Sequence, residues 1–395
     1  MQPDADGRPR RGADQASPSV VVTTHYWQPH TGGIETVAAA HATELTRRGW
    51  TVRAHSSWTD RTSTRSADEG QFHLTRHRVL NPLEQWANVP VPFPLPGLRR
   101  RLMADVRSSS IVVAHGHVYP ISVTAARAAA AASRPFVVIQ HSPWVEYPRP
   151  VEMVERLADR VVGRRVLEAA RMVICVSEFT QDYVRSIAPN AHTTVIANGV
   201  DSNRFVHGDR HVHGDRHGRG DVVRFVAVRR LVPRTGVDLL VEAWRRADLH
   251  PHAELLIASD GPMRSALERA AQGLRGIRFL GRVDDDTLVG LLQNADATVV
   301  PTRSGEGFGL AAAEAHACGT PVIATNQGAL GEVVRDGVDG LLVPTGDVGA
   351  LARALTRFTH DPTLRAQLRS GAEGTDWSWE TAGSRLDALL RDIIG

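Results

Sequence analysis

Two glutamates stand eight residues apart in the stretch SGEGFGLAAAEAHACGTPV, residues 304–322. Glu306 lies in a glycine-rich turn, and Glu314 lies in an apolar run typical of a buried helix. Because a buried carboxylate is costly without a partner, either both side chains reach solvent or both bind something. Two carboxylates could accept hydrogen bonds from a sugar and a ribose joined by a diphosphate. The alternative is a solvated loop residue and an ion-pair partner on a helix face, and the spacing alone does not decide.

The same stretch supplies backbone groups that could hold an anion. A strand is expected at 297–302, and a helix is expected to begin near Leu310 and to end at the CGTP segment. The amides of Phe308, Gly309 and Leu310 would then lie at a helix N-terminus, where unpaired N–H groups favour anions or hydroxyls. The segment therefore predicts a ligand-facing turn.

The elements that must position this turn are short apolar strands that alternate with amphipathic helices. Such strands imply parallel sheets covered on both faces. The pattern predicts an α/β protein with two doubly wound, Rossmann-like domains. After the first strand, Gly32 and Gly33 could let the backbone approach a ligand, although a plain tight turn explains them equally well. The expected strands lie within residues 19–27, 51–57, 108–116, 134–142, 171–177, 192–199, 222–228, 253–259, 276–281, 297–302, 321–325 and 340–345.

Domain boundaries follow from composition. We expect a disordered tail at 1–18, a first domain at 19–203, a linker at 204–221, a second domain at 222–375 and an amphipathic C-terminal helix at 376–395, which could return to the first domain. The linker repeats the motif HGDRH. Its four histidines could bind a metal, but a flexible linker is the default for so polar and repetitive a segment.

Composition excludes several classes of protein. The chain contains no lysine, so all 46 basic residues are arginine. A pyridoxal phosphate held as a Schiff base and a P-loop lysine are therefore excluded. The net charge of +3 over 395 residues gives no argument for a nucleic-acid partner. No apolar run is long enough for a spanning helix, and no signal peptide is evident. We expect a cytoplasmic protein in which Cys175 and Cys318 are buried, reduced thiols.

The stretch PTRSGEGFGLAAAEAHACGTPVIATNQGALGEVV, residues 301–334, resembles the signature of the retaining glycosyltransferases of family 4, which have the two-domain GT-B fold. The shared features are the E-x7-E pair, GFGL, EAxACGTPVIA and GEVV. The resemblance covers nearly the whole chain, including QPHTGGIETVAAAHATELTRRGWTV (28–52), GVDSNRF (199–205) and RRLVPRTGVDLLVEAW (229–244).

This resemblance implies retaining transfer of a hexose-type sugar from a nucleoside-diphosphate sugar, bound mainly by the second domain, to a hydroxyl acceptor bound mainly by the first. Neither a metal nor a cofactor is implied. Glu314 would accept hydrogen bonds from the ribose, and Glu306, with the amides of Phe308, Gly309 and Leu310, would hold the donor sugar and phosphate. Arg230 would face the diphosphate.

The resemblance also implies roles for two residues of the first domain. Gly33 would lie under the phosphate or the acceptor. A histidine after a strand would point at the donor sugar, and the segment VVAHGHVYP offers His115 and His117, of which the pattern favours His117. His141 is a weaker candidate of the same kind, and a histidine packed at a strand end is the other interpretation of each.

The chain departs from the family at two positions. Arg229 replaces a glycine, and Thr235 replaces a lysine that normally neutralises diphosphate charge. We expect Arg234 to take over that role, since its guanidinium has five N–H donors and a long reach. The departure also leaves open a degenerate member that binds nucleotide-sugar or a partner protein without transfer. A phosphorylase of similar architecture would need a lysine-bound cofactor and is excluded.

Two basic, partly amphipathic stretches lie in the first domain, at 97–109 and 156–171. Such surfaces could bind an anionic membrane peripherally, at its inner face, if the acceptor is lipid-linked. An ordinary solvated helix face is the other interpretation. The sequence identifies neither the nucleotide, the sugar nor the acceptor.

Overall fold

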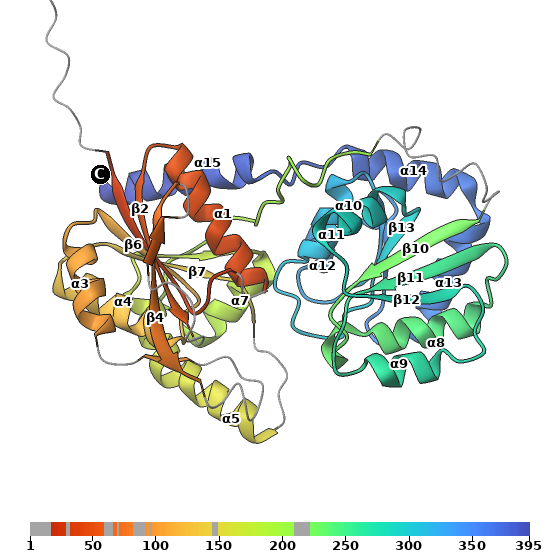
Figure 1. Cartoon of the computed structure of the whole chain (residues 1–395), viewed down its shortest axis with the longest axis horizontal. Coiled ribbons are helices and arrows are strands. Elements are labelled where there is room, and N and C mark those ends of the chain that lie inside the picture. Colours follow the sequence, from red (N-terminus) through yellow and green to blue (C-terminus); the bar gives the residue numbers. More distant parts are fainter. Residues whose placement is uncertain are drawn as a thin grey trace, which may run out of the picture. The chain divides into compact units, whose positions relative to one another are not determined.

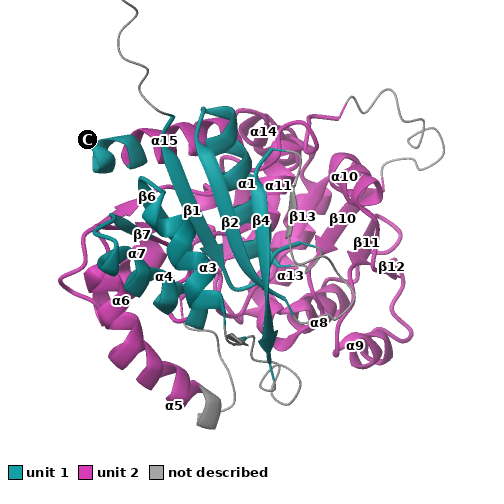
Figure 2. Cartoon of the chain, turned by 60° about the vertical axis from the view of Figure 1, so that its left-hand side comes forward, with its two compact units in different colours: residues 1–115, 119–137, 390–395 teal, residues 116–118, 138–389 magenta. Residues whose placement is uncertain are grey.

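A computed structural model describes residues 17–28, 32–58, 66–68, 71–81, 92–94, 97–143, 149–208 and 222–395. Most of the expected tail and linker therefore lies outside the described residues. The chain divides into two compact units (Figure 2). Unit 1 contains residues 1–115, 119–137 and 390–395, and unit 2 contains residues 116–118 and 138–389.

Unit 1 is built on parallel strands covered by helices (Figure 1). Strand β1 pairs in parallel with both β2 and β6, and its residues are buried except at the first position. This burial on both faces explains the continuous apolar run in its sequence. Helix α1 ends at Arg47, two residues before Gly49. The elements are β1 (Ser19–Thr24), α1 (Gly33–Arg47), β2 (Thr51–Trp58), β3 (Ser66–Asp68), β4 (His73–Leu80), β5 (Phe93–Pro94), α3 (Leu98–Arg107), β6 (Ile111–His115) and α4 (Pro120–Ala131).

Strand β4 is absent from the expectations because its sequence, HLTRHRVL, looks polar. Thr75, Arg76 and His77 are nevertheless buried. The strand pairs in parallel with β2 and places His77 beside His55. Polar partners inside the unit, rather than apolar contacts alone, therefore stabilise this part of the sheet.

Strands β7 to β9 extend the first sheet, whose order is β3-β4-β2-β1-β6-β7-β8-β9, with β5 paired to β4. Between β7 and β8 the chain forms a helix interrupted by one π-helical turn, η1, a feature often found at functional sites. Helix α7 begins at an N-cap serine, Ser177, whose side chain accepts a hydrogen bond from the amide of Thr180. These elements are β7 (Phe136–Gln140), α5 (Arg149–Ala158), η1 (Asp159–Gly163), α6 (Arg164–Ala169), β8 (Met172–Cys175), α7 (Glu178–Ile187) and β9 (Thr193–Val195).

A second parallel sheet of six strands has the order β12-β11-β10-β13-β14-β15. Its core contains Phe225, whose ring contacts Trp244 edge-on and lies 5.6 Å from Phe358. The elements are β10 (Val223–Val228), η2 (Pro233–Thr235), α8 (Val237–Ala247), β11 (Ala253–Ala258), α9 (Arg264–Ala270), β12 (Ile277–Gly281), α10 (Asp285–Asn294), β13 (Ala297–Val300), α11 (Leu310–Ala317), β14 (Val322–Thr325), α12 (Leu330–Val333), β15 (Gly340–Val343), α13 (Val348–His360) and α14 (Pro362–Glu373). The two sheets with their helices, parallel except where β3 and β5 pair antiparallel with β4, confirm the expected Rossmann-like α/β class.

The C-terminal helix α15 (Trp379–Ile394) contributes residues to both units. Before it, the ring of Trp377 lies 5.6 Å from that of Phe308. At its other end Arg391 lies over the ring of Trp50 and donates a hydrogen bond to the carbonyl of Arg48. Its last residues therefore pack with the amino-terminal part of the chain.

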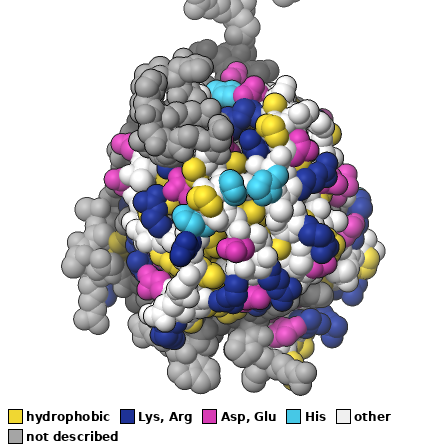
Figure 3. Space-filling model, turned by 90° about the vertical axis from the view of Figure 1, so that its right-hand side faces the viewer, with side chains coloured by type: hydrophobic (Ala, Val, Ile, Leu, Met, Phe, Trp, Pro, Cys, Tyr) yellow, Lys and Arg dark blue, Asp and Glu magenta, His cyan; other side chains and the backbone are white. Residues whose placement is uncertain are grey.

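Cys175 and Cys318 are buried free thiols, which confirms that they do not form a disulfide. Burial raises the pKa of both to about 12. None of the helices in the described ranges is long and apolar enough to cross a bilayer. On the face shown in Figure 3, arginines and carboxylates are interspersed, and no patch of one sign dominates that view.

Candidate active site

The glycine-rich turn ends at the first residue of α11, as the sequence predicts. Gly309 is the N-cap of α11 and has a φ of +101°, a left-handed conformation that favours glycine. The amides of Phe308, Gly309 and Leu310 donate to no acceptor in the described part of the chain. An anionic or hydroxyl ligand could satisfy them, because the helix dipole also favours negative charge there.

The turn is held by residues far away in the sequence. The carbonyl of Gly307 accepts hydrogen bonds from Ser177 Oγ at 2.6 Å and Thr180 Oγ1 at 3.1 Å. A Cβ atom on residue 307 would lie 2.0 Å from the carbonyl oxygen of His141, so only glycine fits. On the other side, the carbonyl of Glu306 accepts from the amide of Ala329. The position of Glu306 is thus fixed by contacts on both sides of the turn.

Glu306 has a charged partner that the spacing of the two glutamates did not suggest. Arg229 donates from Nη2 to Glu306 Oε2 at 2.6 Å and to Thr302 Oγ1 at 3.1 Å. Thr302 Oγ1 in turn donates to Glu306 Oε2 at 3.2 Å. The side chains of Arg229 and Glu306 are only 13% and 14% exposed. Glu306 is therefore a partly buried carboxylate in an ion pair, not a solvated loop residue.

Glu314 lies one element further on, inside α11. Burial raises the pKa of its carboxyl to about 7, although the positive charges of Arg204 and Arg229 oppose the shift. Arg204 itself pairs with Asp285 at 2.7 Å. The two glutamates therefore share the field of Arg229, and Glu314 titrates near neutral pH, where a hydrogen-bonding ligand could change its ionisation.

The three-residue turn η2 places the arginines of the RRLVPRTG segment. Arg230 and Arg234 are both exposed, whereas Thr235 is buried and donates its hydroxyl to the carbonyls of Arg230 and Val232. A Cβ atom on Gly305 would lie 3.8 Å from Nη1 of Arg234. Arg234 therefore reaches the glycine-rich turn, while the Thr235 hydroxyl is engaged with its own turn.

His117 lies in a buried polar network and is 2% exposed. Its Nδ1 lies 2.8 Å from Gln140 Oε1, and its Nε2 lies 3.0 Å from Asp159 Oδ1. The other oxygen of Asp159 accepts a hydrogen bond from Tyr183. Gln140 Nε2 donates to the carbonyl of Ser142, which orients the amide oxygen toward His117. Both ring nitrogens of His117 therefore face a side-chain oxygen.

In this arrangement both nitrogens of His117 are engaged by protein atoms. A contact with a donor sugar would require one of these partners to be exchanged, so its role at the sugar stays a prediction. His115 is completely buried, and Gly33 is the first residue of α1 in unit 1. Sequence reasoning missed Asp159, whose only signal is a carboxylate in an otherwise ordinary amphipathic stretch.

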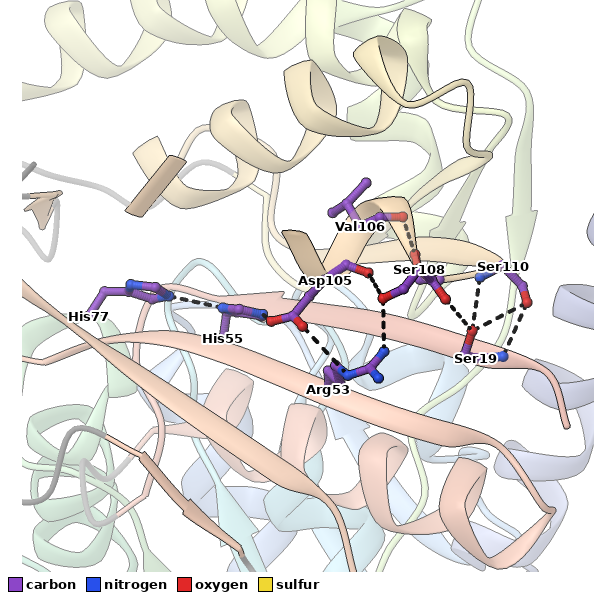
Figure 4. A network of polar contacts seen from close by, with 9 residues as sticks. Ser19, Arg53, His55, His77, Asp105, Val106, Ser108 and Ser110 are labelled. Carbon is purple, nitrogen blue, oxygen red and sulfur yellow. Dashed lines mark hydrogen bonds and ion pairs between the residues drawn. The ribbon is translucent and has the colours of Figure 1, made fainter. Parts of the chain in front are cut away.

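A separate polar network lies in unit 1 and is formed by side chains of β2, β4 and α3 (Figure 4). His55 Nδ1 lies 2.9 Å from His77 Nε2, and His55 Nε2 lies 3.1 Å from Asp105 Oδ2. The hydrogen bond from His55 is the main cause that holds the pKa of Asp105 below its usual value, and Arg53 adds to it. Burial lowers the pKa of His77 to about 3. Among the described residues, no cluster of three or more His, Cys, Asp or Glu side chains is placed to hold a metal ion.

Both halves of the sequence are similar to known protein families. Residues 31–204 match the family described as Glycosyltransferase Family 4, and residues 215–375 match the family described as Glycosyl transferases group 1. A GDP-mannose-dependent monoacylated alpha-(1-6)-phosphatidylinositol monomannoside mannosyltransferase of Corynebacterium glutamicum is 29% identical over 399 residues, covering 95% of this chain and 98% of that protein.

A glycogen synthase of Mycobacterium tuberculosis is 31% identical over 304 residues, covering 73% of this chain and 70% of that enzyme. The crystal structure of Anabaena HepE in complex with UDP-glucose superposes with a TM-score of 0.73 at 20% identity, covering 94% of this chain and 99% of that one. At this identity the likeness supports the fold. The chain therefore belongs to the group 1 glycosyltransferases and is a glycosyltransferase with two Rossmann-like α/β domains.

Proposed function

We propose that this glycosyltransferase moves a hexose from a nucleoside-diphosphate sugar to a hydroxyl acceptor with retention at the anomeric carbon, and that arginines rather than a metal ion supply the charge opposite the diphosphate. The observation that carries the proposal is the grouping of Glu306, Arg229 and Glu314 beside the unsatisfied amides that begin at Phe308. Two carboxylates and a set of N–H donors match a ligand that has hydroxyls at both ends and a diphosphate between them.

The roles follow from the chemistry of each group. Glu314 accepts hydrogen bonds from the ribose of the nucleotide, and Glu306 accepts from the donor sugar. Arg230, which lies between β10 and η2, and Arg234, in η2, are both exposed, and they meet the negative charge that develops on the leaving diphosphate. Arg234 supplies the charge that the inward-facing Thr235 does not, and Gly33 and His117 contribute from the other half of the chain.

The test is a panel of UDP-, GDP-, ADP- and dTDP-hexoses, each incubated with protein and acceptor extracts while release of the nucleoside diphosphate is followed. We expect release with one nucleotide class, persisting in excess chelator. Loss of activity in chelator, restored by a divalent cation, would contradict the metal-independent part. The product's anomeric configuration, read by NMR, tests retention.

The second candidate is a degenerate member that binds nucleotide-sugar or a partner protein without transfer. It is favoured by Thr235, which stands where the resemblance implies a lysine. Measurable binding of a nucleotide-sugar by calorimetry, together with no release of diphosphate from any donor, would support this candidate over the enzyme.

We further propose that the acceptor is lipid-linked and that the helical segment α5–η1 docks the enzyme on an anionic membrane at the cytoplasmic side. The segment exposes five large apolar side chains, which we call the α5 surface: Met153, Val154, Leu157, Val161 and Val162, exposed by 72%, 68%, 62%, 44% and 37%. A cluster of this kind is typical of a binding surface rather than of an ordinary solvated helix.

Positive charge flanks the α5 surface. Arg160 and Arg165 are exposed and have no ion-pair partner among the described residues. An apolar stripe with free arginines matches a bilayer with anionic headgroups. The lipid acceptor named for the Corynebacterium relative is in line with this choice. The other basic stretch, α3, buries its apolar residues Leu98, Leu102 and Val106 and offers no such face.

Sedimentation with vesicles tests the docking. We expect the protein to sediment with phosphatidylglycerol vesicles at low salt and to dissociate from them as the salt concentration rises. It should not sediment with phosphatidylcholine vesicles. Met153→Ser with Leu157→Ser should abolish sedimentation, and Arg160→Gln with Arg165→Gln should weaken it. The matched control is Arg246→Gln, an exposed arginine on α8. No sedimentation at any ionic strength would point to a soluble acceptor.

A further inference from the structure

Arg229 is one of the two positions at which this chain departs from its family, and its side chain lies at the candidate site. It stands where the resemblance implies a glycine, so nothing in the family pattern gives it a role. In the structure its guanidinium donates to Glu306 Oε2 at 2.6 Å, and this is the carboxylate expected at the donor sugar. Glu306 lies 77 residues away in the sequence, so the pair forms only in the folded protein.

Stability alone does not account for the pair. Both side chains are largely removed from water, and the desolvation of a charged pair can cancel its attraction. The Nε atom of Arg229 is buried and has no acceptor among the described residues, which adds a further cost. An arginine placed at some cost beside a ligand-facing carboxylate indicates a function.

We propose that Arg229 is a positioning and specificity residue that fixes Glu306 and decides which of its oxygens the donor sugar meets. Glu306 Oε2 receives hydrogen bonds from Arg229 and from Thr302, so it is largely used by the protein. Oε1 remains for one sugar hydroxyl. The inference rests on the proposed role of Glu306 and deepens it.

The arrangement has a consequence for the donor. A bare glutamate can accept hydrogen bonds from two neighbouring sugar hydroxyls, one at each oxygen. Here the second hydroxyl meets an arginine N–H and must accept instead of donate. Binding of the donor sugar therefore depends more strongly on the orientation of its hydroxyls than it would beside a free carboxylate. The site should discriminate between sugar epimers that differ at that hydroxyl. The positive charge of Arg229 also offsets the repulsion that Glu306 alone would exert on an acidic sugar.

The experiment measures the affinity that the sugar adds to the nucleotide. UDP, UDP-glucose, UDP-galactose and UDP-glucuronic acid, with GDP and GDP-mannose in parallel, are titrated by calorimetry into wild type and variants, and turnover is measured for the donor that transfers. In Arg229→Gln we expect the gain from nucleotide to nucleotide-sugar to fall at least fivefold, discrimination between UDP-glucose and UDP-galactose to narrow, and kcat to fall at least tenfold. UDP and GDP affinities should stay within twofold of those of the wild type when all titrations are done at pH 9, where Glu314 stays ionised even without the opposing charge of Arg229.

Two further variants separate positioning from folding. Arg229→Lys keeps the charge and should restore part of the sugar's contribution. Thr302→Val removes the second donor to Glu306 together with one acceptor of Arg229 but leaves the ion pair, and it should show a smaller loss of the same kind. If Arg229→Gln melts at a markedly lower temperature than wild type, the inference is judged on the titrations of Arg229→Lys and Thr302→Val instead, since each of these variants preserves the ion pair.

The double variant tests whether Arg229 acts through Glu306. In a Glu306→Gln background the additional change Arg229→Gln should cost less than twofold, because the group it positions has already been neutralised. Additive losses, or equal losses of UDP and UDP-glucose affinity, would overturn the inference while leaving the enzyme intact. Absence of transfer in wild type would overturn the proposed function, and the binding titrations would still decide the role of Arg229.

Discussion

The raised pKa of Glu314 predicts that binding of a nucleotide-sugar is coupled to proton release. The carboxyl has a pKa of about 7 because it is buried, so about half of the molecules carry a proton there at neutral pH. A ribose diol donates two hydrogen bonds best to the ionised form, so binding should drive the proton off. The replacement that removes this effect with little change of volume is Glu314→Gln.

The size of the effect follows from the titration. With a pKa of about 7, the ionised fraction rises from about one tenth at pH 6 to about nine tenths at pH 8. If only the ionised form binds, affinity should rise about tenfold over this range, equivalent to about 1.4 kcal/mol. At neutral pH about half a proton should leave per ligand bound. In Glu314→Gln affinity should fall by roughly 1.5–3 kcal/mol at pH 8, because a charge-assisted acceptor is lost.

Calorimetry in two buffers of different ionisation enthalpy measures the released protons directly. UDP-glucose and GDP-mannose are the probes, because a diphosphate esterified at both ends does not itself titrate near neutrality. Glu268→Gln, the same change on the exposed face of α9, should behave as wild type. The reasoning fails if the binding enthalpy is independent of buffer, or if Glu314→Gln keeps the pH dependence of the wild type.

Three further predictions concern turnover and stability. Glu306→Gln should depress kcat more than donor affinity, because its contact with the sugar strengthens as the diphosphate leaves; wild-type kinetics in this variant would remove it from the site. Arg234→Ala should lower transfer about ten- to several-hundred-fold, and unchanged transfer while Arg230→Ala is inactive would leave one arginine and the α11 amides to hold the diphosphate. The pKa of His77 is lowered from 6.5 to about 3 by burial, so the native state binds fewer protons than the unfolded chain between these values. Its contribution is full above pH 6.5 and is lost on acidification, so the free energy of unfolding should fall by about 2 kcal/mol from pH 7 to pH 5, and urea titrations of His77→Phe should show a smaller fall.

The sequence was sufficient to predict the strands of the second sheet and the glycine-rich turn that follows β13. Each expected strand from 222 to 345 appears close to its predicted place, because most residues of these parallel strands are apolar. The exceptions are single charged residues, such as Arg224 in β10 and Glu254 in β11, and the partly exposed strand β12. The same reading failed for β4, where a buried histidine pair and Arg76 give the strand a polar sequence. Local composition predicts burial only when the buried partners are apolar.

The site was predictable in part for a similar reason. The two glutamates and the helix start at Leu310 are local in sequence and could be predicted from a few residues. The partner of Glu306 could not, because Arg229 lies at the end of another strand and reaches it only through the packing of β10 beside β13. His117 illustrates the same limit, since it contacts Gln140 at the end of β7 and Asp159 in a π-helical turn that no simple pattern predicts.

The two hydroxyls on the carbonyl of Gly307 have a consequence for protein engineering. Because a peptide unit is planar and trans, a carbonyl held in one direction sets the N–H of the next residue, Phe308, in the opposite direction. Ser177 and Thr180 therefore orient an amide that lies about 130 positions later in the chain. A chimera that joins residues 222–395 of this protein to the first half of a relative would inherit the turn without those hydroxyls wherever the relative has no hydroxyl side chain at the positions of Ser177 and Thr180. Grafts meant to exchange donor preference should therefore carry the first turn of α7 with them.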